Sequence, residues 1–60
     1  MRRIELDERE AEVLGEILRD YISDVRMEIA DTDSQEFRDD LKQRETIAKD
    51  LLGRLERPIA

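Results

Sequence analysis

Residues 7–30 carry apolar side chains at alternating intervals of three and four, the spacing of a helix that packs along one side. The positions at this spacing are Ala11, Leu14, Leu18, Tyr21 and Val25, and Val13, Ile17, Ile22 and Ile29 lie beside them. Asp7 precedes the pattern and Glu10 follows it by three residues, as in a capping box at a helix start. The apolar side of this predicted helix is wider than one partner helix covers.

Residues 34–56 repeat the pattern and predict a second helix. The positions at the same spacing are Phe37, Leu41, Arg44, Ala48, Leu51 and Leu55, with Ile47 and Leu52 beside them. Leu55 fits the pattern beyond Gly53, so we expect the helix to reach about Glu56. Pro58 then ends it, because proline lacks an N–H and disfavours helical geometry in the residue before it.

Residues 31–33 separate the two patterns and predict a short turn. Asp33 or Ser34 can cap the free N–H groups of the second helix, and Asp33 and Glu36 have the spacing of a second capping box. Asp31-x-Asp33-x-Gln35 also resembles the start of a calcium loop. That loop needs glycine where this chain has Glu36 and a bidentate carboxylate where it has Lys42, so we favour the capping interpretation.

Folding the chain back at this turn brings the two patterns into antiparallel register, with Val25 opposite Leu41 and Leu18 opposite Ala48. The fold class is therefore all-α, a single hairpin domain over residues 1–60. A second hairpin would cover the apolar side chains that flank the first contact, which predicts a four-helix bundle. The expected oligomer interface comprises Leu14, Ile17, Leu18, Tyr21, Ile22, Val25, Ile29, Phe37, Leu41, Arg44, Ile47, Ala48, Leu51, Leu52 and Leu55.

The run Tyr21–Asp33 resembles a group of short, uncharacterised bacterial helical-hairpin proteins, and its Ile-Ala-Asp-Thr-Asp turn is the most specific part. The resemblance extends to the pairs Phe37-Arg38, Leu41-Lys42 and Leu51-Leu52. It implies the hairpin and no activity. The architecture is also similar to that of RNA-binding hairpin dimers of plasmid copy-number control, with which the chain shares no sequence match.

The composition limits how the chain is stabilised. Sixty residues make one domain whose single core is marginal, and the absence of cysteine and histidine excludes disulfides and the usual metal ligands. Oligomerisation remains, so we expect a homodimer or a higher homo-oligomer. No apolar run approaches the roughly 20 residues that span a bilayer, and the N-terminus lacks a signal-peptide pattern. We therefore expect a cytoplasmic protein without membrane contact.

The net charge of −6 lies mostly in the first half of the chain. Residues 7–30 hold 8 acidic and 3 basic side chains, whereas residues 34–57 hold 6 of each. No segment is strongly basic, which argues against a nucleic-acid surface. Acidic residues recur every fourth position at Glu8, Glu12, Glu16, Asp20, Asp24 and Glu28. A solvated face is the favoured interpretation, and a docking strip for a basic partner or a cation is the alternative.

Arg44 occupies a position where the pattern calls for an apolar residue. Its stem can pack near Tyr21 or Ile22 while the guanidinium reaches solvent and Asp40. The other interpretation is a polar residue that selects the register or the partner, as in coiled coils. We expect Tyr21 to lie in the core with its hydroxyl at the edge.

These observations predict a non-enzymatic protein–protein interaction module that self-associates, with an unidentified protein as a further possible partner. The chain has no histidine, cysteine or glycine-rich phosphate loop, so we expect no catalysis, metal or cofactor. The alternative is a small nucleic-acid-binding hairpin dimer that uses Arg38, Lys42, Lys49 and Arg54.

Overall fold

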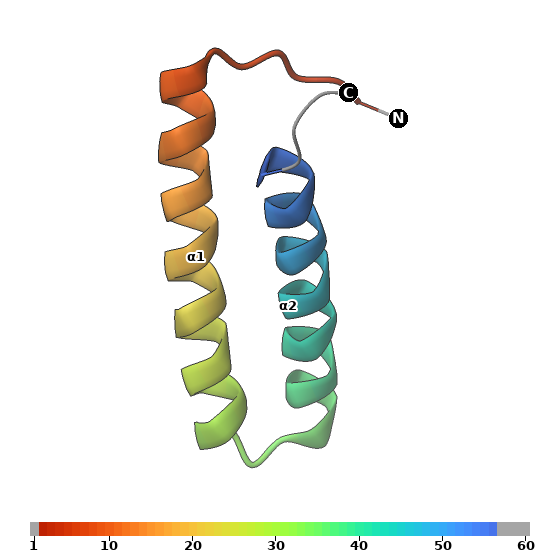
Figure 1. Ribbon diagram of the computed structural model, residues 1–60. Helices are drawn as coiled ribbons and strands as arrows, with labels where there is room; N and C mark the ends of the chain where they lie inside the picture. Colours follow the sequence, from red (N-terminus) through yellow and green to blue (C-terminus); the bar gives the residue numbers. More distant parts are fainter. Residues whose placement is uncertain (1, 57–60) are drawn as a thin grey trace.

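The computed structural model describes residues 2–56, which form two antiparallel α-helices joined by a short turn (Figure 1). Helix α1 spans Glu8–Asp31 and helix α2 spans Gln35–Glu56. The molecule is a rod with extents of 42 × 23 × 17 Å. The all-α hairpin predicted from the sequence is confirmed. Pro58, which we expected to end the second helix, lies outside the described residues.

A capping box starts α1, as predicted. Oδ1 of Asp7 accepts a hydrogen bond of 2.8 Å from the Glu10 N–H, and Oε1 of Glu10 accepts one of 3.1 Å from the Asp7 N–H. At the other end, Thr32 is the C-cap, and its N–H donates to the Glu28 carbonyl oxygen at 2.9 Å.

Ser34 caps α2. Its Oγ accepts a hydrogen bond of 3.3 Å from the Phe37 N–H, and its carbonyl oxygen accepts one of 2.9 Å from the Arg38 N–H. The prediction of a capping box at Asp33 and Glu36 is wrong. In a capping box, the third residue after the cap bonds back to the cap N–H through its carboxylate, and for a cap at Ser34 that residue is Phe37, which has none. The Arg38 guanidinium also donates to the Thr32 carbonyl oxygen at 2.6 Å. Arg38 thereby ties the start of α2 to the end of α1.

The core lies along one line of contact between the helices. Its buried members are Gly15, Ile22 and Val25 of α1 and Leu41 and Ala48 of α2. Half-buried residues continue the line at the same intervals of three and four, namely Ala11, Leu18 and Ile29 on α1 and Arg38, Glu45, Leu52 and Leu55 on α2.

This line differs by one residue from the predicted one at several positions. Gly15 and Ile22 replace Leu14 and Tyr21 on α1, and Glu45 replaces Arg44 in the middle of α2. A guanidinium on the line without a carboxylate beside it would lose hydration without compensation. Glu45 instead has two basic neighbours, so it occupies the half-buried position at lower cost.

Gly15 helps to set the line because it lies against α2. A Cβ built on it would come within 3.8 Å of Leu52 Cδ1. Leu52 of α2 therefore lies close to the backbone of α1 at Gly15, at a distance that a methyl group would fill as an ordinary contact.

The N-terminal arm, residues 2–7, crosses the open end of the hairpin from the start of α1 toward the end of α2 (Figure 1). Leu6 is half-buried there. Ile4 and Leu6 line a hollow together with Leu14 and Leu55. The arm thus places Leu6 at the end of the core, whereas Ile4 stays 76% exposed.

Candidate interaction surface

One flank of the hairpin, on one side of the contact line, carries most of the exposed apolar surface. We define the apolar flank as Leu14, Ile17 and Tyr21 of α1 and Phe37, Ile47 and Leu51 of α2. Tyr21, Ile47 and Leu51 line one shallow groove between the helices. Leu14 and Leu51 line the hollow at the open end, and Tyr21 and Phe37 line a groove near the turn. The flank therefore runs from one end of the rod to the other.

The apolar flank exposes more large side chains than the core buries. The buried apolar residues of the core are Ile22, Val25, Leu41 and Ala48. On the flank, Ile17 is 56% exposed, Ile47 61% and Phe37 49%. Tyr21, expected in the core, is also exposed, at 38%. Its ring lies beside the contact line because Ile22 occupies the position on it.

The opposite flank is lined by charged residues. Arg26, Met27 and Lys49 line a groove there with Ile22 and Leu52. Met27 is an isolated exposed apolar side chain among the cations. The guanidinium of Arg19 on this flank pairs with the carboxylate of Glu56. We name this side the charged flank.

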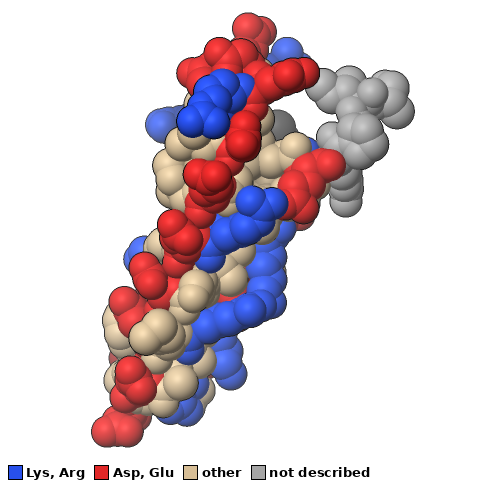
Figure 2. All heavy atoms as spheres, turned by 60° about the vertical axis from the view of Figure 1, so that its left-hand side comes forward, with Lys and Arg blue, Asp and Glu red and all other residues tan. Residues whose placement is uncertain are grey.

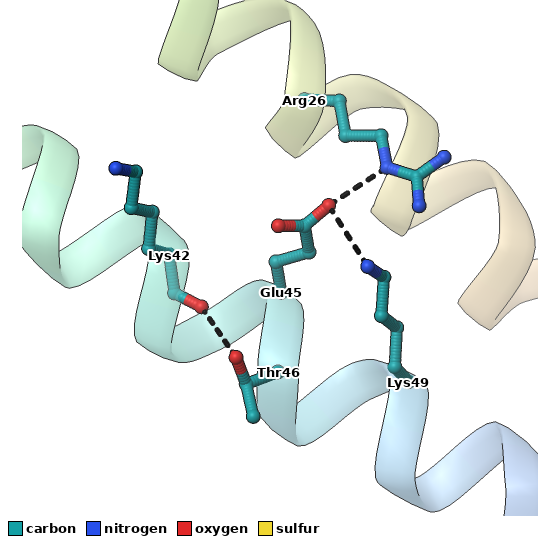
Figure 3. A network of polar contacts seen from close by, with 5 residues as sticks. All are labelled: Arg26, Lys42, Glu45, Thr46 and Lys49. Carbon is teal, nitrogen blue, oxygen red and sulfur yellow. Dashed lines mark hydrogen bonds and ion pairs between the residues drawn. The ribbon is translucent and has the colours of Figure 1, made fainter.

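Glu45 is the centre of the charged flank (Figure 3). Its Oε2 accepts a hydrogen bond of 2.7 Å from Arg26 Nε on α1 and lies 3.6 Å from Lys49 Nζ on its own helix. The hydrogen bond from Arg26, followed by the charge of Lys49, lowers the pKa of Glu45 against the opposing effect of its partial burial. The hydroxyl of the next residue, Thr46, donates to the Lys42 carbonyl oxygen at 3.0 Å. Glu45 thus joins the two helices near their middle, as the Arg19–Glu56 pair does near the open end.

Arg44 lies on the apolar flank, beside Tyr21. Its Nε donates a hydrogen bond of 2.8 Å to Asp40 Oδ2, and its side chain is exposed. The Tyr21 hydroxyl and then the Asp40 carboxylate raise the pKa of Arg44. The stem against Tyr21 with the guanidinium at Asp40 is the arrangement predicted by the first of our two interpretations.

The acidic row of α1 is exposed at each of its six positions, Glu8 to Glu28. Figure 2 shows Asp and Glu side chains following α1 along most of its length, with Lys and Arg side chains gathered beside them. A spacing of four residues exceeds the 3.6 residues of one helical turn, so the row winds around the helix. Among residues 2–56, no cluster of three or more carboxylates is placed to hold a metal ion.

Three of the four cations of the nucleic-acid alternative, Arg38, Lys42 and Lys49, share one side of α2 at intervals of four and seven, and Arg54 does not. Arg38 is bound to the Thr32 carbonyl, and Lys49 lies on the charged flank beside Glu45. Arg54 lies at the other side of α2, where it lines the hollow with Leu14 and pairs with Asp50 at 2.9 Å.

Within the described part of the chain, no helix is long and apolar enough to cross a membrane.

The fifteen expected interface residues divide between two surfaces. Those on the contact line inside the hairpin are Leu18, Ile22, Val25, Ile29, Leu41, Ala48, Leu52 and Leu55. Those that line the grooves of the apolar flank are Leu14, Tyr21, Phe37, Arg44, Ile47 and Leu51. Ile17 joins them because it lies three residues after Leu14 and four before Tyr21 on the same side of α1. Sequence reasoning missed Gly15 and Glu45. The signal for Gly15 was the alternation of four and three that Ala11, Gly15, Leu18 and Ile22 also satisfy. No local pattern singled out Glu45, which pairs with Arg26 on the facing helix.

Comparison with known proteins finds no match among family models, curated proteins or solved structures.

Proposed function

We propose that the chain is a non-enzymatic protein–protein interaction module that self-associates through the apolar flank into a four-helix bundle. The observation that carries this proposal is the uneven distribution of apolar side chains. Ile17, Tyr21, Phe37, Ile47 and Leu51 are exposed on one side of a rod whose core, among residues 2–56, buries four apolar residues, Ile22, Val25, Leu41 and Ala48. A contiguous exposed apolar surface of this kind marks an interaction site.

A second copy of the chain matches this surface in length and in apolar character. It presents a flank of the same length, and two-fold association places the same surface on both partners. Each fully buried Ile, Leu or Phe contributes roughly 1.5–3 kcal/mol, so covering several of them on each copy supplies the stability that a small core lacks. Side-chain packing of this type forms the core of four-helix bundles.

Light scattering after size exclusion tests the proposal. We expect a mass of at least twice 7.1 kDa at micromolar concentration, with helicity that falls as the chain is diluted through dissociation. A fully helical species of 7.1 kDa over the same range would contradict the proposal.

A further inference from the structure

Helix α2 carries a stripe of acidic and basic side chains arranged symmetrically about its middle. Each acid on one side of the midpoint has a base at the same distance on the other side. We define the α2 stripe as Asp40, Arg44, Ile47, Asp50 and Arg54, all of which are exposed. Arg44 forms an ion pair with Asp40 at 2.8 Å, and Arg54 forms one with Asp50 at 2.9 Å. One ion pair therefore lies on each side of Ile47. Intervals of four, three, three and four keep these side chains on one side of the helix.

The stripe is symmetric about Ile47. Arg44 and Asp50 lie three residues from Ile47, and Asp40 and Arg54 lie seven residues from it. A second α2 laid against the first in the opposite direction therefore meets an acid with a base at each of these positions. At the centre, Ile47 meets its own copy, and its 61% exposure leaves it free to do so.

We propose that the partner on the apolar flank is a second copy whose α2 runs antiparallel to the first, related to it by a two-fold axis at Ile47. This inference rests on the proposed self-association and adds its direction. Asp40 of each copy then faces Arg54 of the other, and Arg44 faces Asp50. The turn of one hairpin lies at the open end of its partner.

The opposite alignment, with both turns at one end, brings like charges together. In that alignment, Asp40 of one chain lies beside Asp40 of the other. The same holds for Arg44, Asp50 and Arg54. Like charges placed opposite one another disfavour an association, whereas complementary charges fix its register. The stripe therefore discriminates between the two alignments while leaving the apolar contacts available to both.

Exchanging acidic and basic residues within the α2 stripe tests the antiparallel direction without changing the composition of the chain. In the half-swap variant, Asp50→Arg and Arg54→Asp exchange one ion pair, which leaves the pair within the helix but sets like charges against each other in the antiparallel dimer. The full-swap variant adds Asp40→Arg and Arg44→Asp, which restores every cross-copy pair. Net charge is the same in both variants, and each keeps two ion pairs within the helix, with the acid–base order reversed in one pair of the half-swap and in both pairs of the full-swap.

We expect the half-swap variant to associate about tenfold more weakly than the parent at low salt, because four cross-copy contacts change from attraction to repulsion. The full-swap variant regains the affinity of the parent. High salt reduces the difference, since exposed charges are screened over about 10 Å at 0.1 M. A half-swap variant that associates like the parent, or a full-swap variant as weak as the half-swap, overturns the inference.

Spin labels give an independent measurement, and the absence of cysteine allows one label per chain. Asp33→Cys labels the turn, and Gln43→Cys labels the middle of α2. At 1.5 Å per residue, the antiparallel dimer places two turn labels about 40 Å apart and two middle labels within about 25 Å. The parallel alignment brings both pairs within about 25 Å.

The two proposals fail in different ways. If the two turn labels and the two middle labels are both close together, the chains self-associate but the antiparallel direction is wrong. The absence of any dipolar coupling at concentrations where helicity is complete overturns self-association and the inference with it. A long turn distance with a short middle distance supports both.

Discussion

Arg26 and Glu45 form a hydrogen-bonded ion pair between the two helices, with 2.7 Å from Arg26 Nε to Glu45 Oε2. Arg26 is largely exposed, whereas the Glu45 side chain is only 18% exposed. The carboxylate therefore sits at the edge of the core, and the cations of Arg26 and Lys49 cover it from α1 and α2. Its contribution to stability depends on whether it is ionised.

Glu45→Gln is expected to lower the melting temperature at pH 7 and to have little effect near pH 3. The pKa of Glu45 is lowered in the folded chain, so its stabilisation is present above the pKa of the unfolded chain, about 4.3, and is lost as the pH falls through the folded value. Thermal melts of both chains from pH 7 to pH 3 measure this. Glu16→Gln, at an exposed position of α1, serves as the control. A difference that grows on acidification would contradict the assignment.

Ile47→Glu is expected to weaken association at least about a hundredfold, because a two-fold dimer loses two buried isoleucines of roughly 1.5–3 kcal/mol each. Met27→Glu is the matched control. Met27 is 63% exposed against 61% for Ile47, but it lies on the charged flank. Sedimentation equilibrium of both variants measures the effect. Equal losses would show that the apolar flank has no special part in association.

Ser34→Ala is expected to cost about 1 kcal/mol of stability, because the hydrogen bond from the Phe37 N–H to its Oγ is lost. Asp33→Ala should cost only about 0.3 kcal/mol, through the helix dipole alone. Denaturant unfolding of the two variants separates them. If Asp33→Ala proves the more costly, the cap belongs to Asp33 and not to Ser34.

Gly15→Ala is expected to raise stability by about 0.5–1 kcal/mol, since glycine in a helix interior is unfavourable. The added Cβ would meet Arg19 at 3.7 Å and Leu52 at 3.8 Å, which are ordinary contacts. Gly53→Ala, with nothing within 4 Å of its Cβ, serves as the comparison near the end of α2. Destabilisation by Gly15→Ala alone would mean that the helices approach too closely there for a methyl group.

The hairpin was predictable from local information. The capping box of Asp7 and Glu10 depends on residues three apart, and the apolar intervals define each helix. The rotation of each helix was harder to predict, because the apolar residues occupy two adjacent lines. Arg44 and Glu45 are neighbours with opposite charge, and only the position of Arg26 on the facing helix favours Glu45 on the contact line. Such a contact joins residues 19 apart in the chain.

The local sequence also could not predict whether Ser34 or Asp33 caps α2. Both are good capping residues, and both precede the helix. In the structure, Thr32 Oγ1 accepts from the Ser34 N–H at 3.3 Å, and Arg38 holds the Thr32 carbonyl. These contacts fix where α1 ends, and thereby which residue reaches the first N–H groups of α2.

The brevity of the turn has a kinetic consequence. Only Thr32, Asp33 and Ser34 separate α1 from α2, so closing the hairpin costs little chain entropy and uses mostly local contacts. Helical proteins of this kind fold within microseconds to milliseconds. At micromolar concentration, a typical association rate of about 10⁶ M⁻¹s⁻¹ brings two chains together only about once per second. The chain would therefore close on itself long before it meets another. Refolding would show a fast phase of partial helix formation that is independent of concentration, followed by a slower, concentration-dependent phase that completes the helicity.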